Sequence, residues 1–166
     1  MVLLPLKASD VNLAYAILSS RIAGLIARGI DQYPGPFPPR KTFLERQKRG
    51  HNFALYNHAK PVAIVTIQEN YIPPEWSECA DQQSHAWVSS LFVAPDHKYR
   101  RVGHLILDAI QAHLRQRGIS RIYLDCYIDS GFLEGYYSAC GYQTVAKKMF
   151  VYPDRKFSAA LMKKDL

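Results

Sequence analysis

The residues of this chain that are best placed to do chemistry lie in one short basic stretch. Between Leu91 and Ile110 the sequence reads LFVAPDHKYRRVGHLILDAI, with Lys98, Arg100 and Arg101 between a strand-like run and a helix-like run. The first turn of a helix offers unpaired N–H groups and the positive end of the helix dipole. Added cations make such a turn an anion site. We therefore expect a phosphorylated ligand here, although this stretch alone is equally compatible with a solvated basic turn.

The elements that must position this turn follow from the apolar periodicities. They predict strands over 2–6, 51–56, 61–68, 86–94, 121–127, 142–152 and 157–162, and helices over 13–25, 42–48, 102–117 and 131–140. Ser9 or Asp10 is expected to cap the first helix, and 33–39 and 69–84 are expected to be loops. Strand–helix–strand order in the second half requires at least one parallel pair in a sheet otherwise built from hairpins.

Composition sets the broad class of the protein. With 166 residues, 48% apolar and 21% charged, the chain fits one soluble domain over residues 1–166. Its net charge of +7 favours acidic ligands. Cys79, Cys126 and Cys140 are odd in number and lack metal-ligand spacing, which indicates reduced thiols, a cytoplasmic location and no metal site. No apolar run suits a signal peptide or a membrane span, so we expect no membrane partner.

A second motif follows the strand predicted over 121–127. Residues 129–142 read DSGFLEGYYSACGY, with Tyr137 four residues before Gly141. Together with the basic turn, this pattern resembles the GNAT superfamily of acetyl-CoA-dependent N-acetyltransferases. The family's turn motif is Arg/Gln-x-x-Gly-x-Gly/Ala. This chain has Lys98 at the first position, Arg101 at the first glycine and Gly103 at the last, while Ser130 stands where the family tends to place Asn.

The resemblance implies both a fold and a cofactor. The fold is α/β with a mixed sheet: three layers, in which a central, mostly antiparallel sheet with one parallel, splayed strand pair is flanked by helices. Acetyl-CoA is the implied acyl donor, with a longer acyl-CoA left open by the departures in the turn. The implied cofactor-binding residues are Leu91, Phe92, Val93, Lys98, Tyr99, Arg100, Arg101, Val102, Gly103, His104, Ser130 and Tyr137.

The resemblance also implies direct attack of a primary amine on the thioester. Tyr137 is then the implied catalytic residue, because a phenol with an ordinary pKa of ~10 can protonate the leaving thiolate. The resemblance fixes no base for the amine proton, and Glu69, His85 and Asp125 are the candidates near strand ends. Cys126 lacks a neighbouring base in sequence, so we interpret it as a small buried residue.

Charge patterning bears on the acceptor. The stretch 61–97 contains no Lys or Arg but carries five carboxylates, Glu69, Glu75, Glu78, Asp81 and Asp96. Such an acidic window favours a small cationic amine or a peptide amine as acceptor. A loop that merely aids solubility is the alternative interpretation.

Two rival functions and one assembly remain open. A non-catalytic module that binds or senses acyl-CoA is favoured by Arg101 in place of glycine. Nucleic-acid binding is favoured by the net charge and by five Lys and Arg residues in Arg40–Gly50. It lacks aromatic interleaving or a recognition-helix pattern, so we do not expect a nucleic-acid partner. Apolar residues near the C-terminus offer a homodimer seam: Phe150, Val151, Tyr152 and Phe157.

Overall fold

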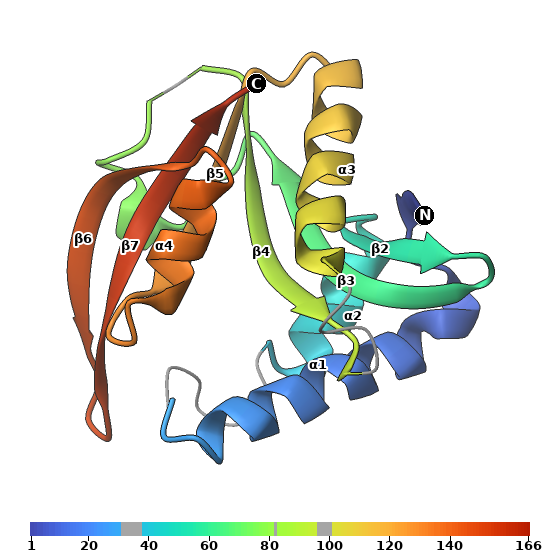
Figure 1. Cartoon of the computed structure of the whole chain (residues 1–166), viewed down its shortest axis with the longest axis horizontal. Helices are drawn as coiled ribbons and strands as arrows, with labels where there is room; N and C mark the ends of the chain where they lie inside the picture. Colours follow the sequence, from blue (N-terminus) through green and yellow to red (C-terminus); the bar gives the residue numbers. More distant parts are fainter. Residues whose placement is uncertain (31–37, 82, 96–100) are drawn as a thin grey trace. The chain divides into compact units, whose positions relative to one another are not determined.

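The computed structural model describes residues 1–30, 38–81, 83–95 and 101–166. Seven strands of this described part form one sheet in the order β1-β2-β3-β4-β5-β7-β6 (Figure 1). The strands are β1 (Val2–Pro5), β2 (Asn52–Asn57), β3 (Lys60–Glu69), β4 (His85–Val93), β5 (Arg121–Tyr127), β6 (Gln143–Val151) and β7 (Lys156–Asp165). The helices are α1 (Val11–Ile26), α2 (Arg40–Lys48), α3 (Val102–Gln116) and α4 (Phe132–Ala139), with 3₁₀ turns at η1 (Ala8–Asp10) and η2 (Pro74–Trp76).

The sheet is mixed, as the sequence predicted. Strands β4 and β5 run parallel, with His85 opposite Arg121 and Trp87 opposite Tyr123. The β1–β2, β2–β3, β5–β7 and β6–β7 pairs are antiparallel. A crossover through α3 connects the two parallel strands β4 and β5. This arrangement confirms the predicted fold class, a mixed α/β sheet flanked by helices.

The chain groups into two compact units, which are described separately. Unit 1 comprises Met1–Ile67 and Ser89–His113, and unit 2 comprises Gln68–Val88 and Leu114–Leu166. The chain therefore enters unit 2 near the end of β3, returns to unit 1 in the middle of β4, and enters unit 2 again within α3. The expectation of one domain over residues 1–166 stays a prediction.

Unit 1 buries helices against the strands β1 to β3. Its core joins Leu18 and Ile22 of α1, Phe43 of α2, and Ala54 of β2. Neighbouring residues of a strand point to opposite faces, and Phe53 accordingly contacts His113 of α3, with ring centroids 5.1 Å apart. Helices thus cover both faces of this part of the sheet.

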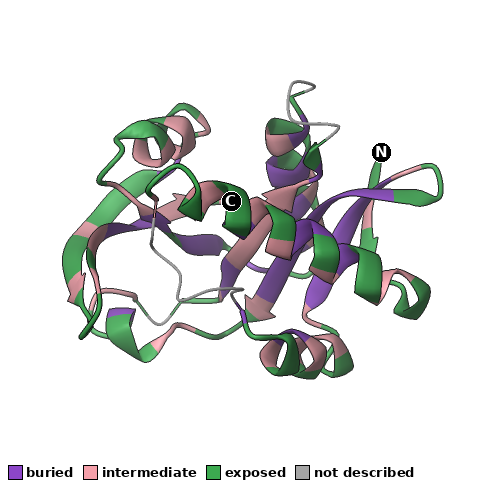
Figure 2. Cartoon of the chain, turned by 90° about the horizontal axis from the view of Figure 1, so that it is seen from below, coloured by how far each residue is buried: buried purple, intermediate pink, exposed green. Residues whose placement is uncertain are grey.

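Unit 2 has a different arrangement on each face of its strands. On one face, Trp76 of η2 packs with Trp87, Tyr123 and Leu161. On the other face lies α4, where Glu134 accepts hydrogen bonds from Thr144 (2.8 Å) and Lys147 (3.0 Å) of β6. The purple, buried residues in Figure 2 follow the strands, whereas the outer sides of the helices are green and exposed.

One local prediction was wrong. Neither Ser9 nor Asp10 caps α1 through its side chain. The Asp10 carboxylate instead accepts a hydrogen bond from the hydroxyl of Tyr56 (2.8 Å), whose ring is buried in β2. The tertiary contact uses the oxygens that local capping would have required. Among the described residues, no helix is long and apolar enough to cross a membrane.

Candidate active site

The predicted anion-binding turn ends at the start of α3 in unit 1. The carbonyl of Arg101 accepts hydrogen bonds from the N–H groups of His104 (3.0 Å) and Leu105 (3.1 Å). Helix geometry leaves the N–H groups of Val102 and Gly103 without an acceptor inside the helix. Of the other residues predicted for this turn, Lys98, Tyr99 and Arg100 lie outside the described residues.

Arg101 has an unusual backbone conformation. Its φ is +53°, in the left-handed region, and its side chain is exposed. This region is sterically costly for residues with a Cβ and free for glycine. Arg101 stands at the position where the turn motif has its first glycine. The backbone shape suited to glycine is therefore kept here, although the residue is not glycine.

The second half of β4, also in unit 1, contains another strained residue. Ser90 has φ +51° in the middle of the strand, which bends the backbone at this point. The guanidinium of Arg46 on α2 lies 3.5 Å from the Ser90 hydroxyl. Leu91, Phe92 and Val93 are half-buried, and Phe92 packs against the unit 1 core. Sequence reasoning missed Ser90, because serine carries no signal for a left-handed residue inside a strand.

Tyr137 lies on α4 in unit 2 and is half-buried. Its ring meets Tyr136 (5.3 Å between centroids) and Tyr142 (5.6 Å) edge to face. The backbone carbonyl of Tyr137 accepts hydrogen bonds from the N–H groups of Cys140 (2.9 Å) and Tyr142 (3.0 Å), and these bonds fix the end of the helix. Ser130 is exposed just before α4.

Asp125 lies on β5 with its side chain on the face opposite α4. The register pairs Asp125 with Leu161, a member of the Trp76 core, and the Trp76 indole N–H donates to the Asp125 carboxylate (3.3 Å). Asp125 touches solvent, yet enough protein surrounds the carboxyl that lost hydration raises its pKa. The Trp76 hydrogen bond opposes this rise, and the negative charge of Glu75 adds to it. A carboxylate of raised pKa is suited to accept a proton.

Glu69 and His85, the other candidate bases, lie elsewhere in unit 2. The Arg117 guanidinium contacts both carboxylate oxygens of Glu69, one through Nη2 at 3.1 Å. His85 pairs with Arg121, and four residues separate Arg121 from Asp125, roughly 13 Å along a strand. The structure therefore separates His85 from Asp125, and it engages the Glu69 carboxylate with Arg117.

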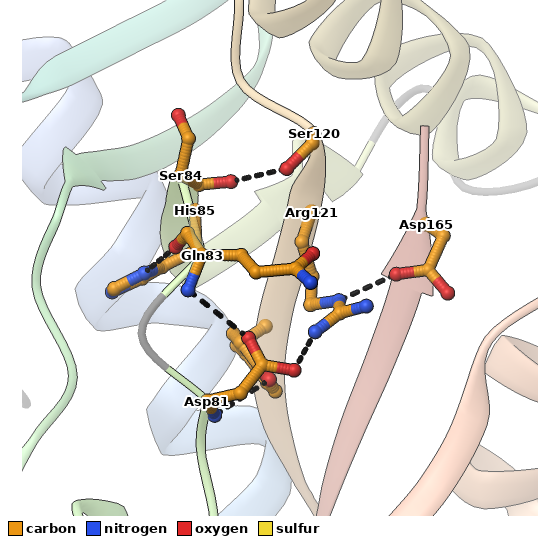
Figure 3. Close-up of polar contacts among 8 residues, drawn as sticks. Asp81, Gln83, Ser84, His85, Ser120, Arg121 and Asp165 are labelled. Atoms are coloured by element: carbon orange, nitrogen blue, oxygen red, sulfur yellow. Dashed lines mark hydrogen bonds and ion pairs between the residues drawn. The ribbon is translucent and has the colours of Figure 1, made fainter.

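His85 borders a polar cluster that joins the segment before β4 to β5 and β7 (Figure 3). Arg121, only 10% exposed, forms ion pairs with Asp81 and Asp165. The other oxygen of Asp81 accepts the N–H of Gln83 (3.3 Å), and the Nδ1–H of His85 donates to the Gln83 carbonyl (2.7 Å). These contacts hold the segment in place and leave Asp81 without a free carboxylate oxygen.

An open cavity of about 360 Å³ adjoins this cluster. Its described lining comes from unit 2 and consists of Asn70, Ile72, Ser77, Ala80, Asp81 and His85. The carboxylate of Asp81 in this lining is already paired with Arg121. The described lining therefore offers no unpaired carboxylate for chemistry.

Comparison with known proteins places this geometry in a family. The model of the acetyltransferase (GNAT) family matches residues 24–142. The chain belongs to the GNAT family. This GNAT protein is accordingly an acyltransferase, and the turn at Arg101 and the α4 tyrosine both fall inside the matched region.

Solved structures share the fold of this GNAT protein at low sequence identity. The ribosomal-protein-S18-alanine N-acetyltransferase of Escherichia coli is 19% identical with a TM-score of 0.70, over 99% of this chain and 92% of that one. A GNAT acetyltransferase of Listeria monocytogenes is 13% identical with a TM-score of 0.79, over 99% and 94%. The ribosomal-protein-alanine N-acetyltransferase of Brucella melitensis is 11% identical with a TM-score of 0.72, over 100% of both chains. A search of curated proteins finds no match.

None of the three cysteines of this GNAT protein forms a disulfide. Burial raises the pKa of Cys126 to about 12, and its sulfur lies 3.6 Å from that of Met162. A buried thiol that stays protonated is a poor nucleophile, in line with the interpretation of Cys126 as a packing residue. Among the described residues, no group of His, Cys, Asp and Glu side chains could hold a metal ion.

The acidic window of the sequence is partly neutralised in the fold. Glu69 pairs with Arg117 and Asp81 with Arg121, two arginines that follow more than 30 residues later in the chain. Asp96 lies outside the described residues. Glu75 and Glu78 are exposed in unit 2, and neither forms an ion pair with another described residue.

Proposed function

We propose that this GNAT protein transfers the acetyl group of acetyl-CoA to the nitrogen of a primary amine. The observation that carries the proposal is the left-handed turn at Arg101, which opens the first turn of α3 in the region matched by the family model. A turn of this shape exposes adjacent backbone N–H groups, and such groups at a helix N-terminus bind phosphate. The exposed guanidinium of Arg101 adds a positive charge at the same point.

The residues present are compatible with the donor. Val102 and Gly103 have first-turn N–H groups to offer a pyrophosphate, and Leu91–Val93 provide a half-buried strand segment for the apolar arm. Acetyl-CoA, when bound, supplies a thioester whose carbonyl carbon accepts the amine. We assign the cofactor-binding role to these residues and to Ser130, together with the predicted Lys98, Tyr99, Arg100 and His104.

The acid and the base are proposed from unit 2. Asp125 takes a proton from the ammonium form of the acceptor, which frees the nitrogen lone pair. The nitrogen then forms a bond to the thioester carbon, the carbon–sulfur bond breaks, and the hydroxyl of Tyr137 donates its proton to the leaving thiolate. The second proton of the nitrogen passes to the tyrosinate, which restores Tyr137.

The two faces of the unit 2 strands support this division of roles. Asp125 faces the Trp76 side, whereas Tyr137 lies on the α4 side. Strand β5 pairs with β4 as far as Tyr123, two residues before Asp125. An acceptor on one face and a donor on the other could therefore approach the same edge of β5.

The acceptor class follows from charge and from the family. Glu75, Glu78 and Asp125 favour a cationic amine. Two neighbours of the same fold are named for acetylating the alanine of a ribosomal protein, so a peptide α-amine is an acceptor to test beside small amines. A cytoplasmic location and the absence of a nucleic-acid partner stay predictions.

The test measures binding and transfer separately. Acetyl-CoA at ~100 times its Kd should raise the free energy of unfolding by about 2.7 kcal/mol, a shift in Tm of several degrees. Tyr137→Phe should keep this shift and lose transfer, measured as release of the free thiol with an amine panel. Gly103→Asp should lose the shift, because a carboxylate at the first turn repels phosphate.

A sensing module is the second candidate, because Arg101 replaces the motif's glycine. It predicts the same shift in Tm for the wild type but no thiol release with any amine or peptide. Absence of the shift in the wild type would contradict both functions.

A further inference from the structure

An aromatic surface lies beside Asp125 in unit 2 and has no role in the function proposed above. We call it the aromatic row and define it by Tyr127, Phe150, Tyr152 and Phe157. The register pairs Tyr127 with Ala159 and Phe150 with Phe157, so the strand members share the face of Asp125. The row therefore belongs to the acceptor side, opposite α4.

The rings of the row are ordered against one another. Phe157 stacks on Phe150 (5.3 Å between centroids, 16° between planes) and on Tyr152 (6.1 Å, 17°). Tyr127 meets Phe157 at 6.4 Å. At its inner end, Phe150 contacts the edge of Trp76 at 5.7 Å, and that same indole orients the Asp125 carboxylate. The carboxylate and the row thus share one anchoring side chain.

The row is accessible, unlike the core that supports it. Trp76 is only 1% exposed, whereas Tyr152 is 42% exposed and the other three members are half-buried. Ring faces and edges that remain open to solvent are hydrophobic surface with a preference for other aromatic groups. At the outer end, the Arg155 guanidinium already covers one side of Tyr152 at 4.6 Å. The contact stiffens the tip of the β6–β7 hairpin.

Charge and spacing indicate what binds there. Asp125 and Glu75 are acidic side chains that lie near each other, and the nearby Lys148 ammonium is held by the Glu75 carbonyl at 2.8 Å. Tyr127 follows Asp125 by two residues, roughly 6.6 Å along a strand. An ammonium separated from an aromatic ring by a short carbon chain spans a comparable distance.

We infer that the acceptor is a primary amine carrying an aromatic ring, with its ammonium at Asp125 and its ring on the aromatic row. This inference rests on the proposed function and narrows its acceptor class. The contact provides specificity rather than chemistry, because the rings touch the substrate away from the reacting nitrogen. It predicts discrimination between amines of equal charge that differ only in the ring.

The experiment compares 2-phenylethylamine with n-butylamine at saturating acetyl-CoA, with thiol release as the readout. We expect kcat/KM to favour 2-phenylethylamine by about 3- to 10-fold, the range of an aromatic contact. Tyr127→Leu should bring the ratio close to one, because Tyr127 is the ring of the row within reach of an ammonium at Asp125. Phe132→Leu is the matched control, since Phe132 is an aromatic residue of α4 that is 70% exposed on the opposite face. It should leave the ratio unchanged.

The possible outcomes separate the inference from the proposed function. If Tyr127→Leu lowers Tm but leaves the ratio unchanged, the row has only a structural role and the inference is wrong. Transfer to n-butylamine with no preference for the ring would also overturn it, while the proposed function would stand. Failure of acetyl-CoA to shift the Tm of the wild type would overturn the proposed function itself, and the inference with it.

Discussion

The conformation of the turn can be tested by comparing glycine with alanine at position 101. Alanine usually gives the more stable protein, but at position 101 we expect glycine to do so. A residue with a Cβ pays about 1–2 kcal/mol in the left-handed region, and φ is +53° at Arg101. Glycine avoids that cost but loses about 0.4–1 kcal/mol through the greater freedom of the unfolded chain. Arg101→Gly should therefore be more stable than Arg101→Ala by about 0.5–1 kcal/mol.

A comparison of these two variants with each other is independent of the charge of Arg101. Both lack the guanidinium, so only the backbone term separates them. For a chain of this size, the difference corresponds to about 1–4 °C in Tm, measurable by calorimetry on both variants in one buffer. Ala23 is the matched control, since it is exposed inside α1 with an ordinary helical environment. Ala23→Gly should destabilise by about 1 kcal/mol.

The same variants separate the two contributions of Arg101 to donor binding. Removal of the cation should weaken acetyl-CoA binding at low salt in both variants, with a smaller effect at high salt. If Arg101→Ala proves as stable as Arg101→Gly or more so, the residue is not held in a left-handed conformation. The turn would then lack the backbone shape that suits the glycine of the motif.

Three further outcomes are expected. Arg121→Ala should lower the free energy of unfolding by about 1–3 kcal/mol in urea titrations, because Asp81 and Asp165 lose a buried partner but keep access to water. The hydrogen bond from Arg121 lowers the pKa of Asp165. The contribution of Asp165 to the free energy of unfolding is therefore fully present above the unfolded-state pKa of ~3.9 and is lost as pH falls through the lower folded-state pKa. Asp165→Asn should make the loss of stability between about pH 5 and 2 less steep. Asp125→Asn should lower kcat/KM and abolish the rise in activity that occurs as pH passes through the raised pKa of Asp125. Glu69→Gln should leave this pH–activity profile unchanged. Equal effects of the two variants would contradict the assignment of Asp125 as the base.

The secondary structure was predictable because its signals are local. In α3, the buried residues Ile106, Leu107 and Ile110 alternate with exposed residues. The sequence shows the same helical spacing of apolar residues. The parallel pair of β4 and β5 followed from the helix between them. The capping prediction failed because Asp10 serves Tyr56, 46 residues away, and no local pattern records that contact.

The membership of the site stays a prediction, and its arrangement could not be predicted from the sequence. Residue spacing singled out Tyr137 and the turn as candidates, yet it said nothing of the left-handed conformations at Ser90 and Arg101. Counting charges along the chain overestimated the acidic window, because the partners of Glu69 and Asp81 are distant arginines. Linear sequence gives the number of charges, whereas the field at the site depends on which of them are paired.

Strand parity adds a constraint that the motifs lack. Asp125 and Cys126 are adjacent, yet one faces Trp76 and the other faces Met162. Tyr137 stands on α4, on the side of Cys126, so the proposed acid and the proposed base, twelve residues apart, lie on opposite faces of the strands. Substitutions on the Trp76 face should then alter the kinetic parameters of the amine, and those on the α4 face should alter the parameters of the donor. A shift of both sets by one substitution would locate that residue at the edge of β5, where the two substrates would have to meet.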